Sequence, residues 1–175
     1  MPNTHKTLIA SDVIQNRIRE LAATIDHDYA HLQNVVLVCV LTGAIPFFDA
    51  LSDALTIPHE KASIRVSSYG VGSRLSTGDV QVLQPINMPL YNAHVIIVED
   101  IIDTGYSMQA VLELIDSESP ASVSVCALLS KPTRRIVDVP IDYLGFSIED
   151  HFVFGYGIDV DQQYRELDYI GYFET

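Results

Sequence analysis

The chain has 175 residues, 48% of them hydrophobic and 19% charged, which is enough apolar material for one substantial core and excludes a disordered segment or a disulfide-stapled miniprotein. Ten basic residues against 23 acidic ones leave a net charge of −13, which argues against nucleic acid as a partner. With no run of about 20 apolar residues and no secretory pattern at the amino terminus, we expect a cytoplasmic protein with no membrane partner.

The first part of the chain predicts helices alternating with strands. Apolar residues at the helical period follow Ser11, which we predict to be the N-cap of a helix ending near Tyr29. The apolar run 35–41 (VVLVCVL) is typical of a strand buried on both faces of a parallel sheet, and a second helix is expected over 45–55. A half-buried strand at 63–67 precedes a long glycine-containing loop, which composition alone leaves open between a functional lid and a disordered tip.

The second part of the chain continues this alternation. Strands are expected at 80–83, 94–98 (HVIIV), 122–129 (SVSVCALL), 143–146 and 152–156, with a turn at 99–107 and a helix from Tyr106. Strands alternating with helices predict an α/β fold, a parallel sheet covered on both faces. We see no repeat or linker and expect residues 1–175 to form a single domain.

The two cysteines, Cys39 and Cys126, lie inside apolar runs. Buried reduced thiols are therefore expected in place of a disulfide or a metal pair. The six histidines show no ligand spacing, and none is assigned to a metal.

Residues 99–107 combine carboxylates with a helix start, directly after a predicted buried strand, where parallel sheets bind ligands. Glu99, Asp100 and Asp103 would repel one another unless a cation or hydroxyl donors bind there. The free N–H groups of the helix start suit a phosphate, so a sugar phosphate would satisfy both halves. The alternative is that Asp103 and Thr104 only cap the helix while the earlier acids are exposed.

The carboxyl-terminal part of the chain is strongly acidic. From Asp138 to Thr175, nine acidic side chains accompany one basic residue, Arg165. Either these carboxylates form a solvated acidic face or some of them hold cations.

Residues 95–107 (VIIVEDIIDTGYS) closely resemble the phosphoribosyl pyrophosphate signature of the type I phosphoribosyltransferases, in the form of their hypoxanthine branch. In family order, 67–79 is similar to the mobile loop (about 68–79), 131–135 (KPTRR) to the purine-contacting lysine segment, and 143–171 to the carboxyl-terminal part of the purine-site region (about 131–175). The resemblance covers the chain from about Ile14 onwards. It implies the type I phosphoribosyltransferase fold, a parallel sheet flanked by helices with a small hood region and a mobile loop.

The resemblance also implies an activity in purine salvage. A 5-phosphoribosyl group would pass from phosphoribosyl pyrophosphate to the 6-oxopurine hypoxanthine or guanine, giving IMP or GMP and pyrophosphate, with Mg²⁺ as cofactor and a homodimer or homotetramer as the assembly. Residues implied to bind phosphoribosyl pyrophosphate are Thr42, Gly43, Ser68, Tyr69, Glu99, Asp100, Asp103, Thr104, Gly105, Tyr106, Ser107 and Arg165. Those implied at the purine side are Lys131, Phe152, Val153 and Asp159.

Within these sets the resemblance implies particular roles. Asp103 would be the catalytic acid or base near the purine N7, and Glu99, Asp100 and Asp159 would hold magnesium. Lys131 would donate to the exocyclic O6, and Phe152 would stack on the base. Taken without the resemblance, Phe152 would be a core aromatic and Lys131 a solvated loop lysine; Arg165 would simply neutralise Asp161 or Glu166.

One position departs from the family pattern. After its first core strand the family usually has Leu-Lys-Gly or Leu-Arg-Gly, where this chain has Leu41-Thr42-Gly43. In relatives this loop binds pyrophosphate through its backbone and often contains a non-proline cis peptide. We expect the backbone role to survive and the side-chain charge to be lost, with weaker pyrophosphate binding or a rearranged subunit contact.

Two alternatives use the same residues. One is a xanthine-guanine phosphoribosyltransferase, against which the Lys131 and Phe152 segments favour hypoxanthine and guanine. The other is a regulatory homologue that senses nucleotides and binds RNA. The net charge of −13 speaks against it, because RNA binding needs a basic face.

Overall fold

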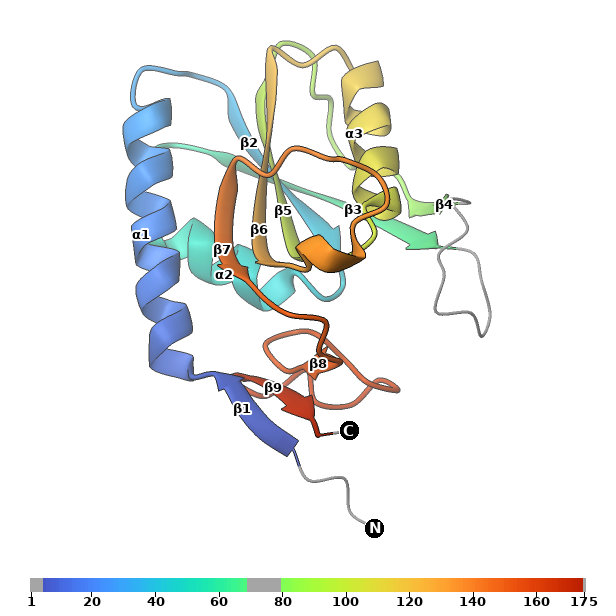
Figure 1. Ribbon diagram of the computed structural model, residues 1–175. Helices are drawn as coiled ribbons and strands as arrows, with labels where there is room; N and C mark the ends of the chain where they lie inside the picture. The colour runs from blue at the N-terminus through green and yellow to red at the C-terminus, as the bar shows by residue number, and fades with distance from the viewer. Residues whose placement is uncertain (1–4, 69–79, 175) are drawn as a thin grey trace.

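The computed structural model describes residues 5–68 and 80–174 and is built around a six-stranded sheet (Figure 1). The strand order is β4-β3-β2-β5-β6-β7, and every neighbouring pair is parallel except β3 and β4. The strands are β2 (Val35–Leu41), β3 (Glu60–Ser68), β4 (Val80–Gln84), β5 (His94–Ile102), β6 (Ser122–Ser130) and β7 (Tyr143–Ser147). The predicted α/β fold is thereby confirmed.

Helices cover both faces of this sheet. α1 (Ser11–Tyr29) and α2 (Ile45–Ala54) pack on one face, and α3 (Tyr106–Ser117) lies on the other (Figure 1). In β2, Leu37 and Cys39 belong to the core beneath α1 and α2, whereas Val36 and Val38 belong to the core beneath α3. A strand buried on both faces has no position for a polar side chain, which explains the uninterrupted run VVLVCVL.

Both cysteines are buried free thiols, as predicted. Burial, followed by the charge of nearby Glu99, raises the pKa of Cys39 to about 12. At neutral pH this thiol is protonated and therefore a poor nucleophile and metal ligand. No helix in the described parts of the chain is long and apolar enough to cross a lipid bilayer.

The chain path creates a topological switch point at one end of the sheet, and we call the place beyond these strand ends the crevice. From β2 the chain passes through α2 to β3 on one side, and from β5 it passes through α3 to β6 on the other, while β2 and β5 are themselves neighbours. The connections therefore diverge beyond the carboxyl ends of β2 and β5, and such a point is where open parallel sheets bind ligands.

A second, three-stranded antiparallel sheet lies beyond this crevice (Figure 1). It contains β1 (His5–Ile9), β9 (Ile170–Phe173) and β8 (Val153–Phe154), in that order. The fully buried Phe154 ring packs against Tyr164 and Phe173, with ring centroids 4.8 and 4.7 Å apart. This sheet is the small hood region implied by the resemblance, although strands β1 and β9 themselves were not predicted.

Two sequence predictions are wrong in their boundaries. Ser11 is the first residue of α1, and its N-cap is Ala10, whose extended backbone makes no side-chain capping bond. Strand β5 does not end at Val98, because its ladder with β6 continues to Ile102 opposite Ser130. Glu99 and Asp100 consequently belong to the strand, and the predicted turn at 99–107 begins only at Asp103.

A carboxylate on α1 fastens the connection between α2 and β3. Asp26 Oδ1 accepts the backbone N–H groups of Thr56 and Ile57 at 3.0 and 3.1 Å, and Oδ2 accepts the Thr56 hydroxyl at 2.9 Å. These bonds hold the start of β3 in register beside α1.

We expect Asp26→Ala to lower the free energy of unfolding by about 1 to 2 kcal/mol, because it leaves the N–H groups of exposed Thr56 and half-buried Ile57 without their charged acceptor. Urea denaturation measures the change, with Asp53→Ala on the exposed side of α2 as the control. A loss no larger than that of the control would contradict this role for Asp26.

Candidate active site

Two adjacent carboxylates stand at the end of β5, facing the crevice. Glu99 is only 8% exposed, and Asp100 is half-buried. Burial raises the pKa of Glu99 well above its usual range, and the neighbouring Asp100 raises it further. Burial also raises the pKa of Asp100, against which the charge of Arg165 acts. Glu99 Oε1 accepts the backbone N–H of Asp100 at 3.1 Å, and Asp100 Oδ1 accepts that of Ile101 at 2.7 Å. A cation or the hydroxyls of a diol would further stabilise the two buried charges.

The loop after β2 comes against this pair without a side chain between them. A Cβ on Gly43 would lie 2.0 Å from Asp100 Oδ2, so any other residue would force the Asp100 side chain to move. The Leu41–Thr42 peptide is cis, as the resemblance implied for this loop. Backbone N–H and C=O groups of the Thr42–Gly43 loop therefore border the carboxylate pair.

Arg65 was not singled out from the sequence, yet its guanidinium donates a hydrogen bond to the hydroxyl of Thr42. Arg65 lies on β3 directly opposite Leu41 of β2, which explains how it reaches the loop. The loop thus has a cation beside it, although position 42 itself carries none. The sequence did not indicate Arg65 as a site residue, because its place beside the loop follows from the parallel pairing of β2 with β3.

Arg165 and Asp159 close another side of the crevice. Arg165 Nη1 donates to the carbonyl of Gly157 at 2.7 Å, and Nη2 lies 2.8 Å from Asp159 Oδ1. Gly157 in turn packs against the carbonyl of Gly43. The partner of Arg165 is therefore Asp159, and the interpretation that it neutralises Asp161 or Glu166 is wrong.

The turn into α3 presents backbone N–H groups to the same crevice. Gly105 is the N-cap with φ +97°, and a Cβ there would lie 2.4 Å from the carbonyl of Val137. The first turn of α3 contains no acidic residue and includes Tyr106 and Ser107. This helix start therefore suits an anion. The Thr104 carbonyl accepts the N–H groups of residues 136 and 137, both at 2.9 Å, which anchors the turn.

Asp103 begins this turn and does not cap the helix, since α3 has no side-chain capping bond. Its Oδ1 accepts a hydrogen bond from Arg134 Nε at 2.7 Å. Arg134 comes from the short helix η1 (Pro132–Arg134), which follows β6. The interpretation of Asp103 and Thr104 as mere helix caps is wrong for Asp103.

Lys131 is buried where β6 ends. Its side chain is 8% exposed, and its ammonium lies 3.6 Å from Asp150 Oδ1. The solvated-lysine interpretation is therefore wrong. A buried ammonium that faces a binding crevice is a strong hydrogen-bond donor with no acceptor capacity.

Phe152, two residues beyond Asp150, is 64% exposed, so the core-aromatic interpretation is wrong as well. Val153, which begins β8, is buried and brings its backbone into the hood sheet. An exposed aromatic ring two residues from the partner of a buried lysine is compatible with binding of a flat heterocycle. Ser68 ends β3, while Tyr69 and the rest of the predicted mobile loop lie outside the described residues.

The carboxylates of Glu99, Asp100 and Asp159 fit magnesium only if the substrate supplies part of its coordination shell. Glu99 and Asp100 offer hard oxygens in a largely buried place, and Asp159, which is paired with Arg165, offers another. Within 5–68 and 80–174, no three His, Cys, Asp or Glu side chains form a ready-made metal site. Magnesium is commonly held by one or two carboxylates together with substrate phosphates, so this donor set is compatible with it.

Comparisons with known proteins agree with this geometry. Residues 9–163 match the phosphoribosyl transferase domain family. The chain is 42% identical over 172 residues to the hypoxanthine phosphoribosyltransferase of Buchnera aphidicola, covering 98% of this chain and 97% of that one. It is 39% identical to the hypoxanthine-guanine phosphoribosyltransferase of Mycobacterium bovis, covering 94% and 83%.

Solved structures give the same result. The hypoxanthine phosphoribosyltransferase of Staphylococcus aureus superposes with a TM-score of 0.91 at 36% identity, over 97% of this chain and 91% of that one. The chain therefore belongs to the type I phosphoribosyltransferase family, in its hypoxanthine phosphoribosyltransferase branch.

Proposed function

We propose that this enzyme transfers the 5-phosphoribosyl group of phosphoribosyl pyrophosphate to hypoxanthine or guanine and so makes IMP or GMP. The observation that carries the choice of base is the buried Lys131 ammonium, which is paired with Asp150, two residues before the exposed Phe152. A lysine can only donate hydrogen bonds. It therefore accepts a purine with oxygen at C6 and rejects adenine, whose amino group at C6 is itself a donor.

The phosphoribosyl pyrophosphate would lie along the carboxyl ends of β2 and β5. Glu99 and Asp100 would accept the ribose hydroxyls, and the 5′-phosphate would receive N–H groups from Thr104 to Ser107. The pyrophosphate would lie against the Thr42–Gly43 backbone, with the guanidinium of Arg165 close by. The contacts between Gly43, Asp100 and Gly157 support this arrangement, since they bring the ribose and pyrophosphate subsites together.

Asp103 would handle the proton of the base. During transfer, N9 of the purine bonds to C1′ while the bond from C1′ to the pyrophosphate oxygen breaks, and the base must lose one proton. Asp103 stands between Lys131 and the helix start, where N7 would face it, and would accept that proton as general base. Val153 would contact the base through its backbone.

Magnesium would be held by Glu99, Asp100 and Asp159 together with substrate oxygens. When bound, it neutralises charge on the pyrophosphate as it leaves. Ser68 and Tyr69 would also contact the pyrophosphate.

We also propose that the enzyme acts in the cytoplasm as a homodimer or homotetramer. The full-length similarity to the relatives above supports a common assembly. Light scattering of the purified chain at micromolar concentration distinguishes a monomer from either assembly.

The direct test is a magnesium-dependent assay with phosphoribosyl pyrophosphate and each of four purine bases. We expect nucleotide from hypoxanthine or guanine, none from adenine, and loss of activity when the metal is chelated. The absence of product from both hypoxanthine and guanine would refute the proposed function, and product from xanthine would extend it. Product from adenine alone would refute the role of Lys131.

Replacing the candidate base tests the proton transfer. Asp103→Asn removes the carboxylate that accepts the proton but keeps the shape of the side chain. We therefore expect kcat to fall at least about 100-fold while the KM values for both substrates change little. Asp116→Asn, an exposed carboxylate on α3, is the matched control. Full turnover by Asp103→Asn would exclude Asp103 from proton transfer.

The cation beside Thr42 can be tested separately. Arg65→Gln should raise the KM for phosphoribosyl pyrophosphate up to about fivefold, the effect of losing one partly screened charge near the pyrophosphate. The KM for hypoxanthine should stay within twofold. Arg19→Gln, an exposed arginine on α1, serves as control, and an unchanged KM for phosphoribosyl pyrophosphate would show that Arg65 only supports the loop.

A further inference from the structure

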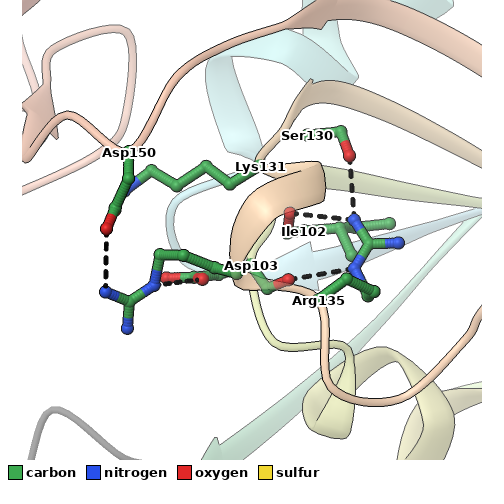
Figure 2. A network of polar contacts seen from close by, with 7 residues as sticks. Ile102, Asp103, Ser130, Lys131, Arg135 and Asp150 are labelled. Atoms are coloured by element: carbon green, nitrogen blue, oxygen red, sulfur yellow. Dashed lines mark hydrogen bonds and ion pairs between the residues drawn. The ribbon is translucent and has the colours of Figure 1, made fainter.

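Four charged side chains form a continuous chain from Lys131 to Asp103 (Figure 2). Lys131 lies 3.6 Å from Asp150 Oδ1, and Arg134 Nη1 lies 3.5 Å from Asp150 Oδ2. Arg134 Nε is 2.7 Å from Asp103 Oδ1. The two groups assigned to O6 and N7 of the purine are thus linked through Asp150 and Arg134.

The geometry of Arg134 suits a bridge. A guanidinium carries several donors in a rigid plane, so one side chain can contact two carboxylates at a set spacing. Its bond to Asp103 is made at Oδ1. A carboxylate has two oxygens, so Asp103 can be held through Oδ1 while Oδ2 would meet a ring nitrogen of the base.

The adjacent arginine has a different task. Arg135 donates to the backbone carbonyl of Asp103 at 2.9 Å, to that of Ile102 at 3.3 Å and to the Ser130 hydroxyl at 2.8 Å (Figure 2). Arg135 thus holds the main chain of the turn. The Asp103 side chain, 38% exposed, has its direction set by Arg134.

We propose that Arg134 and Asp150 are positioning residues that hold Asp103 and Lys131 at the separation required by N7 and O6 of a 6-oxopurine. This inference rests on the proposed function, because it assumes that Asp103 and Lys131 meet those two atoms. N7 and O6 lie on one edge of the base, so both contacts form together only when the two side chains stand correctly relative to each other.

Kinetics of single and double variants test the network. We expect Arg134→Gln to lower kcat with hypoxanthine about tenfold or more, since the misplaced Asp103 takes the proton less often, with the KM for phosphoribosyl pyrophosphate within twofold. Asp150→Asn should raise the KM for hypoxanthine, because Lys131 loses its partner. The fold-loss of kcat/KM for hypoxanthine in the double variant should be smaller than the product of the fold-losses in the two single variants. Such non-additivity is expected for residues that belong to one network.

Two further variants separate positioning from general destabilisation. Arg134→Lys keeps a cation beside Asp103 and should recover part of kcat, whereas Arg19→Gln should behave as wild type. Wild-type kcat in Arg134→Gln, strictly multiplicative losses in the double variant, or no recovery with lysine would each overturn the proposal. Thermal unfolding of every variant identifies losses of activity that are due to misfolding. If Arg134→Gln is unfolded, the kcat of Arg134→Lys compared with that of the wild type decides the question.

A readout without turnover keeps this inference separate from the proposed function. The hydrogen-bonded Nε–H of Arg134 should give a slowly exchanging NMR signal in the wild type that shifts or disappears in Asp103→Asn. An unaltered signal would overturn the network even if the enzyme is active. If the wild-type enzyme is inactive with all four bases while the NMR signal behaves as expected, the proposed function is refuted and the ion-pair network is still supported.

Discussion

The close approach of the loop after β2 to the end of β5 is the contact on which the rest of the site depends. Because Gly43 has no side chain, the loop backbone lies directly against Asp100, and the carbonyl of Gly157 lies close to the same point. Three segments distant in the sequence thereby enclose one crevice. Parallel pairing of β2 with β5 makes this possible, since it places both carboxyl ends at one edge of the sheet.

The net charge of the chain is −13, but the crevice is surrounded by both basic and acidic side chains. Five of the ten basic residues lie around the carboxyl ends of the strands, namely Arg65, Lys131, Arg134, Arg135 and Arg165. Several are already paired with a carboxylate of the site, so positive and negative groups alternate around it. Such an arrangement holds the side chains in place before a substrate binds. The substrate must then replace some of these ion pairs with its own contacts. It also leaves the buried carboxylates Glu99 and Asp100 to a cation or a diol.

Much of the fold could be predicted from local patterns. The apolar runs VVLVCVL and SVSVCALL predict central strands, and the helical period from Ile14 to Ile25 predicts α1. Strands β1 and β9 could not be predicted, because they are short and acquire their order only by pairing with each other across the length of the chain. The end of β5 was misplaced for a related reason. Glu99 and Asp100 are poor strand residues on their own, and the ladder with β6 keeps them extended.

For the site, the sequence by itself determined which groups are available: the carboxylates and helix start of 99–107, the KPTRR segment and the glycine after Thr42. Only the tertiary structure decided how they are paired. It buried Lys131, exposed Phe152, joined Arg134 to Asp103 and brought Arg65 to Thr42. The physical reason is that composition and spacing specify the local conformation and the chemical groups of one segment. Burial and ion pairing depend on which strands become neighbours, and packing of the whole chain sets that.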